Sequence, residues 1–546
     1  MKEFINLYNE WFDNKNWWFS NNNKIDVYLC DKYFCFINST LIIYKEYSNI
    51  YNIYNNKIII GCIILLDQIT RHYKRVYDNN IDVIEYSQKA INFSNLLLYY
   101  NDYTSFTIDE LNFIYLPYRH VKDIDKIYEI INNYIILYDK GNETERSKCK
   151  RYITATLNNI YKDINILSMN NKINVNKWED INKYILDPIS ISNNSNNSNK
   201  NTIVTYDNLI IYSNMLEELE KLKDNSTIIV SLSGGVDSIV ALHVCKYIKD
   251  INNSKKIKNI IAIHINYNNR ETSADELNFI NYYCDKLNIK LYFRTIEEIS
   301  RNKCLHNGLR NLYEEITKNI RYDMYRLNIN NNNTYVLLGH NKDDCFENIL
   351  TNISNKSNYN NLSGMEVLKE IDGINMWRPF LNIEKKYIIS YAIANKIPFL
   401  YDSTPKWSVR GKIRDIIKPA FLKLKNNEDI EDNSIIDSFF DLKEYISETQ
   451  NIFNDLIINN LISKIEYDKL LNQYNALFSK TELLSLRYIP ICELFFKNLK
   501  IKCSHKAMKD FSKYISNYRE RSFVLSKSCI INIANSENNY IIIIKI

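Results

Sequence analysis

The feature that most constrains the fold is a glycine pair, Gly234 and Gly235, between an apolar run at 228–233 and an amphipathic stretch beginning near Asp237. The chain has only 9 glycines among 546 residues, so two in succession indicate a backbone requirement. Glycines permit a tight turn and a close approach to a ligand, and the following helix start offers free N–H groups to a phosphate. The sequence SGGVDS therefore predicts a phosphate-binding loop between a strand and a helix. A plain Gly-Gly turn with Asp237 as helix cap is the alternative.

The same strand–loop–helix order recurs twice further along. Apolar runs at 260–266 and 334–340 precede helical stretches that begin near Ser273 and Asp343. This repetition predicts an α/β domain with a doubly wound parallel sheet. In such sheets ligands bind beyond the carboxyl ends of the strands, which is where the motifs fall.

The length of the chain indicates about two to four domains. The polar stretch from Ser190 to Thr202 cannot bury a core and is typical of a linker. Residues 1–189 lack a strand–helix rhythm and have apolar residues at helical spacing, so we expect an all-α domain there. We expect the α/β domain at 203–426 and a basic, mostly helical region at 427–546, which ends in a β-like run at 540–546.

Several classes of protein are disfavoured by composition. The net charge of +5 is too mild to demand nucleic acid by itself, and the 11 cysteines include no C-x-x-C pair. No apolar run approaches the roughly 18 residues of a membrane span, and the first 20 residues lack the order of a signal peptide. We expect a cytoplasmic protein without a membrane partner; a plastid or another organelle stays open.

The hydroxyls of the glycine loop can donate to phosphate oxygens, and Asp237 can hold Mg²⁺ against them. The chain has no Walker-type lysine signature. SGGVDS resembles the PP-loop of the N-type ATP pyrophosphatases. The resemblance implies that ATP is cleaved between its α- and β-phosphates and is held by one loop, Ser233, Gly234, Gly235, Val236, Asp237 and Ser238.

The second strand ends at His264 and leads to Arg270, in a segment that is similar to that of tRNA(Ile)-lysidine synthetases. Tyr267 and Asn268 replace the usual His and Gly, so no role is transferred to them. His264 is expected in the core or behind the site, with a catalytic role as the alternative. Arg270 suits a phosphate or tRNA contact, because a guanidinium binds phosphate bidentately.

A later helix has Glu314 and the pair Arg321-Tyr322, which resemble another motif of the same family. Lys318 stands where the family has an arginine, so a bidentate contact there is not carried over. A solvated helix face is the alternative for Lys318.

The third strand leads to the segment 339–348, which resembles the family's acidic motif. Asp343, Asp344 and Glu347 share one helix face by their spacing. Like charges this close need a cation between them, which Mg²⁺ or the ammonium group of a lysine can supply. Simple capping of the helix N-terminus is the alternative.

Two further segments, 376–381 and 402–414, continue the resemblance, which spans roughly 225–420 in four ordered blocks. Arg410 and Arg414 lie four residues apart and could hold phosphates of ATP or tRNA. Gly411 replaces an asparagine of the family, so that contact is unassigned.

The resemblance implies a ligase that adenylates the wobble cytidine of an isoleucine tRNA with a CAU anticodon and then joins free lysine to C2, releasing pyrophosphate and AMP. The attacking amine must be neutral. We expect Asp343, Glu347 and Glu314 to bind lysine and accept its proton, and Asp237 and Asp344 to hold Mg²⁺. The implied cofactors are ATP and Mg²⁺.

Two other functions stay open: a tRNA thiolase of the same superfamily, which would use reactive cysteines, and a non-catalytic nucleotide-binding protein. A homodimer also stays open.

The stretch 480–527 carries 11 basic residues against four acids. With Phe495, Phe496, Phe511 and Tyr514 among them, we expect a tRNA-binding surface, and solvated helix faces are the alternative.

Residues 1–189 contain a second pattern, which resembles an uncharacterised all-helical, TPR-like bacterial family. It includes Asp67, Arg71 and His120, with His72 and Val121 where that family has Asn and Ser. These side chains could line a groove; an internal salt-bridged helix pair is the favoured interpretation.

Overall fold

The structure is a computed structural model of the whole chain. It describes residues 1–18, 22–47, 55–77, 80–169, 185–186, 200–251, 255–355, 362–400, 408–424, 434–501, 503–516, 522–526, 529–536 and 539–545. The predicted linker lies outside these ranges up to residue 199, and its last three residues begin helix α11. The domain boundaries at 189, 202 and 426 stay predictions.

The N-terminal region is all helical in its described part up to residue 169, as predicted. Its helices bury apolar residues at three- and four-residue steps, such as Ile127, Ile130, Ile131 and Tyr134 of α8. The helices are α1 Lys2–Asp13, α2 Asn23–Tyr33, α3 Ser39–Tyr47, α4 Asn56–Ile64, η4 Leu65–Ile69, α5 Thr70–Val76, α6 Val83–Tyr100, α7 Ile108–Val121, α8 Ile124–Lys140 and α9 Glu143–Met169, with short turns η1 Lys15–Trp17, η2 Phe34–Phe36 and η5 Tyr103–Ser105.

The central region is the predicted doubly wound sheet. Six strands lie in the order β4-β3-β2-β5-β7-β6, with the first five parallel and β6 antiparallel to β7. The chain proceeds from β2 toward β4 on one side and from β5 toward β7 on the other, so the switch point lies at β2. The strands are β2 Ser226–Ser231, β3 Ile257–Asn266, β4 Lys290–Thr295, β5 Thr334–Leu337, β6 Leu368–Ile371 and β7 Ile374–Trp377.

Alternating residues of β2 face two different cores. Ile228 and Val230 pack with the layer that contains α12 and α17, whereas Ile229 packs on the opposite side. The helices of this region are α11 Lys200–Glu220, α12 Val236–Ile251, α13 Ser273–Lys286, α14 Arg301–His306, α15 Arg310–Arg326, α16 Lys342–Ser354 and α17 Lys385–Ala394. A short antiparallel pair, β1 Ile185–Leu186 and β8 Phe399–Leu400, lies apart from the main sheet.

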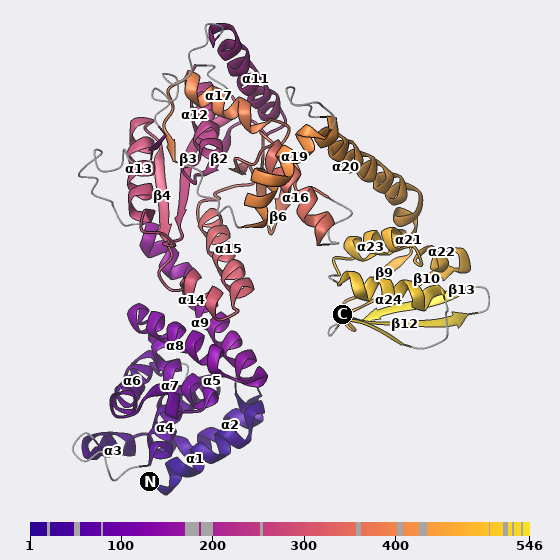
Figure 1. Cartoon of the computed structure of the whole chain (residues 1–546). Coiled ribbons are helices and arrows are strands. Elements are labelled where there is room, and N and C mark those ends of the chain that lie inside the picture. Colours follow the sequence, from indigo (N-terminus) through magenta and orange to yellow (C-terminus); the bar gives the residue numbers. More distant parts are fainter. Residues whose placement is uncertain are drawn as a thin grey trace.

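The core on the Ile229 side is continuous with the core of the N-terminal helices. One cluster of buried residues contains Ile316 and Ile320 of α15 together with Ile153 and Leu157 of α9. Figure 1 shows α14 and α15 below the sheet, on the side where α8 and α9 of the N-terminal helices lie. The Lys303 ammonium also donates to the Asn132 side-chain oxygen across this junction, at 3.1 Å. The N-terminal helices therefore complete the cover of one sheet face, which a parallel sheet requires.

The C-terminal region is reached through the long helix α20 (Figure 1). Helices predominate in it, as expected, and the final apolar run forms strand β13. The structure adds a five-stranded antiparallel sheet, in the order β11-β12-β13-β10-β9, which the sequence analysis did not predict beyond that run. Three short helices end the central region: α18 Val409–Lys412, η7 Ile413–Ile417 and α19 Lys418–Lys423. The C-terminal elements are α20 Ser434–Phe453, η8 Asn454–Ile458, α21 Asn459–Ser463, β9 Ile465–Asp468, β10 Gln473–Ser479, α22 Lys480–Ser485, α23 Ile489–Asn498, α24 His505–Ser516, β11 Phe523–Ser526, β12 Cys529–Ser536 and β13 Asn539–Lys545.

The strands of this unpredicted sheet do show the alternation of buried and exposed residues that is typical of β-strands. Ile531 and Ile533 of β12 and Ile542 and Ile544 of β13 are buried at alternate positions. Isoleucine is so frequent throughout the chain that this alternation does not stand out. Within the described ranges, no helix is long and apolar enough to cross a membrane.

The shared core makes a prediction about cooperativity. Replacing the fully buried Ile320 with Ala should lower the free energy of unfolding by about 2–4 kcal/mol, because the substitution leaves a cavity. Amide protons of α9 and α15 should then exchange faster together. Leu470→Ala, at a side chain that is 97% exposed, should change stability by less than about 0.5 kcal/mol. Unchanged protection of α9 in the Ile320 variant would contradict a shared core.

Candidate active site

The glycine loop leaves β2 and enters α12 at the carboxyl edge of the sheet. Gly234 has a φ of 84°, in the left-handed region that favours glycine, and a Cβ there would lie 2.4 Å from the Leu400 side chain. The Gly234 carbonyl accepts a hydrogen bond from the Leu400 backbone N–H at 3.0 Å. The turn therefore requires the first glycine, and a Cβ there would also have to displace the end of the Leu400 side chain.

Two serines close the loop on itself. The Ser233 backbone N–H donates to the Ser238 hydroxyl at 3.1 Å, and that hydroxyl donates to the Gly235 carbonyl at 3.0 Å. The two hydroxyls also lie 3.1 Å apart. The loop is thus held in shape, and helix α12 begins within it at Val236, where its first N–H groups are available to an anion.

A neighbouring strand supports the loop through His264. Its Nδ1 lies 2.8 Å from the Leu232 carbonyl oxygen, and burial lowers the pKa of His264 to about 4. The imidazole is therefore neutral, and a supporting role in the core agrees with the favoured sequence interpretation.

The loop after β5 touches the glycine loop through Gly339. A Cβ on Gly339 would lie 2.9 Å from the Asp237 carbonyl carbon and 2.9 Å from the Ser238 nitrogen. Only glycine permits this approach of two backbones. The segment after β5 is thereby fixed against the start of α12.

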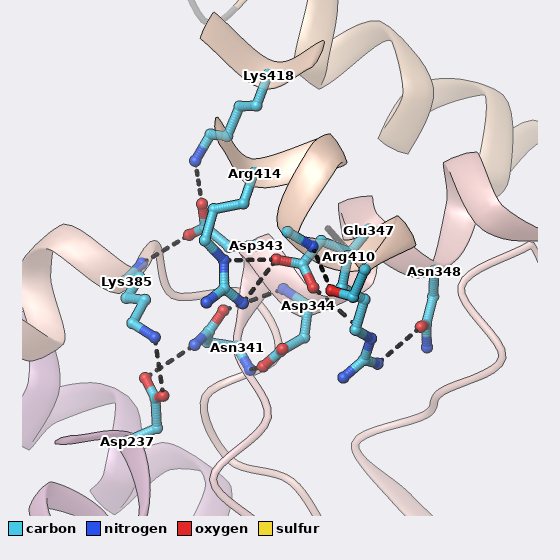
Figure 2. Close-up of polar contacts among 12 residues, drawn as sticks. Asp237, Asn341, Asp343, Asp344, Glu347, Asn348, Lys385, Arg410, Arg414 and Lys418 are labelled. Carbon is cyan, nitrogen blue, oxygen red and sulfur yellow. Dashed lines mark hydrogen bonds and ion pairs between the residues drawn. The ribbon is translucent and has the colours of Figure 1, made fainter. Parts of the chain in front are cut away.

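Asn341 joins the two loops through its side chain. It caps α16 in a reciprocal arrangement: its oxygen accepts from the Asp344 N–H, and the Asp344 carboxylate accepts from the Asn341 N–H. Its amide donates to the Asp237 carboxylate at 2.9 Å (Figure 2). Asp237 and Asp344 therefore both contact Asn341. Capping of α16, the alternative interpretation, is also present, with Asn341 as the cap and Asp344 as its reciprocal partner.

Asp237, Asp343 and Glu347 each form an ion pair with a basic residue from a later part of the chain (Figure 2). Asp343 accepts from the Lys385 backbone N–H at 2.8 Å and forms an ion pair with Lys418. The Lys385 ammonium lies 3.4 Å from the Asp237 carboxylate.

Glu347 is buried and is paired with arginines. Arg414 lies 2.7 Å from its carboxylate and Arg410 lies 3.7 Å from it. Arg410 also donates to the Asn348 side chain at 3.0 Å. Both arginines, predicted as phosphate contacts, are therefore held by the acidic helix α16 in this structure.

The acids differ in how their environment shifts their pKa values. Burial raises the pKa of Asp237, Lys385 opposes this, and the nearby Asp344 adds to it. Burial likewise raises the pKa of Glu347, against the effect of Arg414. For Asp343 burial acts in the same direction, but Lys418 and Lys385 outweigh it and lower its pKa. Asp343 is therefore held as a carboxylate.

Two predicted site residues lie outside this network. Glu314 is exposed on α15 and forms an ion pair with Arg310 at 2.8 Å. Arg270 is half exposed and is paired with Glu276 at 3.0 Å. Residues 402–404 of the last motif lie outside the described residues.

Asn341, Lys385 and Lys418 were not among the site residues predicted from the sequence. A polar residue directly before an acidic helix start is a capping signal that could have identified Asn341. The two lysines carry no such signal, because their partners lie 42 or more positions away in the sequence.

The N-terminal pattern forms an internal polar cluster. Asp67 is 1% exposed and lies 2.9 Å from the His120 ring, while the Ser87 hydroxyl donates to it at 2.6 Å. This agrees with the salt-bridged helix interpretation rather than a groove.

The predicted tRNA-binding surface at 480–527 has exposed basic residues, but most of its aromatic residues are not exposed. Lys506, Lys509 and Lys513 are exposed along α24. The aromatic part of the prediction is wrong for three residues: Phe495, Phe496 and Phe511 are buried in the core of this region and cannot stack on bases.

Across the part of the chain that the structure describes, no three His, Cys, Asp or Glu side chains are grouped so as to hold a metal ion.

The fold and the loop define the class. Residues 208–421 match the family described as PP-loop domain, and residues 7–177 match the family described as bacterial protein of unknown function (DUF924). The central segment is therefore a PP-loop domain, preceded by a helical region of the second family.

The chain is also similar to individual curated proteins. The chain is 28% identical over 287 residues to the bifunctional protein TilS/HprT of Listeria monocytogenes serovar 1/2a, covering 50% of this chain and 42% of that one. It is 27% identical over 280 residues to the tRNA(Ile)-lysidine synthase of Staphylococcus aureus strain MRSA252, covering 46% of this chain and 62% of that one. The chain thus spans less than two thirds of the length of either relative.

Among solved structures, the U34-tRNA thiolase NcsA from Methanococcus maripaludis is similar at 18% identity with a TM-score of 0.35, covering 43% of this chain and 78% of that one.

The Gly339 contact makes a prediction about the loop. Gly339→Ala should weaken ATP binding about tenfold or more, because its Cβ must displace the backbone of Asp237 and Ser238. Calorimetric titration with a non-hydrolysable ATP analogue measures this. Gly235→Ala is the matched comparison: its Cβ would meet only the Ser233 hydroxyl, at 3.6 Å, so stability should persist while ATP affinity falls. Wild-type affinity in both variants would exclude the loop as the nucleotide site.

Proposed function

We propose that this chain is an ATP-dependent ligase that modifies tRNA, adenylating the wobble cytidine of an isoleucine tRNA and joining lysine to it to form lysidine. The observation that carries the proposal is the junction of the PP-loop with the Asn341 loop, which places Asp237 and Asp344 beside the start of α12. The similarity to lysidine synthases supports the choice of reaction.

In this proposal the PP-loop holds the phosphates of ATP. The Gly235 backbone permits close approach, the Ser233 and Ser238 hydroxyls supply donors, and the start of α12 supplies a positive dipole end. The cytidine oxygen attacks the α-phosphorus in line, and pyrophosphate leaves.

A magnesium ion fits between the acids. Asp237 and Asp344 both contact Asn341. Burial raises the pKa of Asp237, and repulsion from Asp344 adds to this effect. A divalent cation beside them would relieve this repulsion. When bound, it would neutralise charge on the leaving pyrophosphate. Lys385, 3.4 Å from Asp237, carries further positive charge to the same place.

The lysine substrate must present a neutral amine. Asp343 is the better candidate for binding its ammonium form, because Asp343 is held ionised by Lys418 and Lys385. Glu347, whose pKa is raised, is the better candidate for accepting the proton at attack. Glu314 stays a prediction.

The tRNA would be held in part by the exposed lysines of α24. The same proposal places the protein where the tRNA is, in the cytoplasm or in a plastid or other organelle.

The thiolase alternative is less favoured on chemical grounds. Cys345 is the cysteine within the acidic motif, and burial raises its pKa to about 11, so it stays a protonated thiol. The cysteines Cys245 and Cys284 are likewise buried, and burial raises the pKa of each to about 12.

The function is tested by incubating the full chain with ATP, Mg²⁺, lysine and unmodified isoleucine tRNA. We expect mass spectrometry of the digested nucleosides to show lysidine. A thiolated base would favour the thiolase, and binding of ATP without any pyrophosphate release would favour a non-catalytic nucleotide-binding protein.

A second prediction separates the two half-reactions. Asp343→Asn should leave tRNA-dependent pyrophosphate release within a few fold of wild type and lower lysine incorporation about 100-fold, since the variant loses one charged contact to the ammonium. Asp441→Asn, at an exposed position of α20, is the control and should match wild type. Full lysine incorporation by the Asp343 variant would remove Asp343 from the lysine site.

A further inference from the structure

Four nitrogen-rich side chains gather beside the PP-loop, and we name them the arginine pocket: Arg321, His340, Arg378 and Arg410. The Leu338 backbone N–H donates to the Trp377 carbonyl at 2.9 Å, so His340 and Arg378 leave adjacent strands side by side. The Tyr325 hydroxyl lies 2.6 Å from the Ser231 hydroxyl, which docks α15 and its Arg321 onto the end of β2.

Three of these side chains have a buried nitrogen without a hydrogen-bond partner: Arg321 Nε, His340 Nδ1 and Arg378 Nε. Arg378 is only 6% exposed. The two arginine Nε–H groups are donors, whereas Nδ1 of a neutral imidazole donates in one tautomer only. Buried donors are almost always satisfied, so two in one place point to an acceptor that the protein itself does not provide. An anion with several oxygens meets this need.

The acids nearby do not account for the cluster. Arg410 is shared with Glu347, at 3.7 Å, and the Arg378 guanidinium donates to the Glu366 backbone carbonyl, at 2.9 Å. Arg321 forms a hydrogen bond with the Tyr267 side chain, which is not an acid. Burial, together with the three arginines, lowers the pKa of His340 to about 4 against the opposing effect of Asp344. The pocket therefore keeps an excess of positive charge around a neutral imidazole.

An aromatic ring borders the pocket. Tyr322 follows Arg321 on α15 and is partly exposed. It lies close enough to Arg378 to oppose, electrostatically, the lowering of the Arg378 pKa by burial. The Lys318 ammonium lies 4.9 Å from its ring centroid. Single-stranded RNA is recognised by this combination of stacking rings and guanidinium groups.

We propose that the arginine pocket binds the phosphate backbone of the single-stranded RNA nucleotide that receives the adenylate, with its base against Tyr322, while the PP-loop holds ATP. This inference rests on the proposed function for the identity of the RNA. The phosphates of ATP could bind the same nitrogen atoms as the phosphates of RNA. RNA is favoured because the PP-loop, which Gly339 contacts next to His340 in the chain, already provides a separate site for the ATP phosphates.

The test uses the full chain and a short anticodon stem–loop RNA with a CAU loop. Arg321→Gln should weaken RNA binding about tenfold and reduce the slope of log affinity against log salt by about one. Arg378→Lys, which keeps the buried charge, should weaken binding less. Binding of an ATP analogue should stay within about twofold in both variants. Arg326→Gln, on the same helix but paired with Asp323, is the matched control and should bind RNA like wild type.

The outcomes separate the two proposals. Unchanged RNA affinity and salt slope in Arg321→Gln would overturn the pocket, even if lysidine is formed. Weakened binding of the ATP analogue with unchanged RNA binding would assign the pocket to ATP and overturn the inference. Loss of RNA binding in a chain that makes no lysidine would uphold the pocket and refute only the proposed reaction.

Discussion

The close approach of Gly339 to the backbone of Asp237 and Ser238 is the constraint on which the site depends. It fixes the loop after β5 against the loop after β2, so Asn341 can reach Asp237 and cap α16 at once. The acids of α16 then face the start of α12. The pairing of β2 with β5 brings the two loops to the same edge of the sheet, and the Gly339 contact sets how closely they approach.

Charge balance organises the rest of the site. Asp343, Glu347 and Asp237 each meet a cation from residues 385–418, a segment that comes late in the central region. The buried acids are therefore compensated before any substrate arrives, which lowers the cost of burying them. The N-terminal helices contribute from the other side of the sheet, because their core continues into α15, the helix that carries Arg321.

The local parts of the site could be predicted from sequence, since they depend on neighbours along the chain. The glycine loop, the strand–helix order and the acidic face of α16 are of this kind, and the central fold is confirmed. The cations Lys385 and Lys418 could not be found, because nothing local distinguishes a lysine that pairs with a distant acid from a solvated one. The C-terminal sheet was missed because frequent isoleucine hides its alternation, and Phe495, Phe496 and Phe511 were assigned to a surface although they fill a core.

The central claim is that this site splits ATP at the bond between the α- and β-phosphates. The most direct measurement follows the products of ATP labelled at the α-phosphate when the full chain, Mg²⁺, lysine and isoleucine tRNA are mixed. The account predicts labelled AMP, with pyrophosphate released in equal amount and only when tRNA is present. Labelled ADP with inorganic phosphate, or AMP formed at the same rate without tRNA, would contradict it.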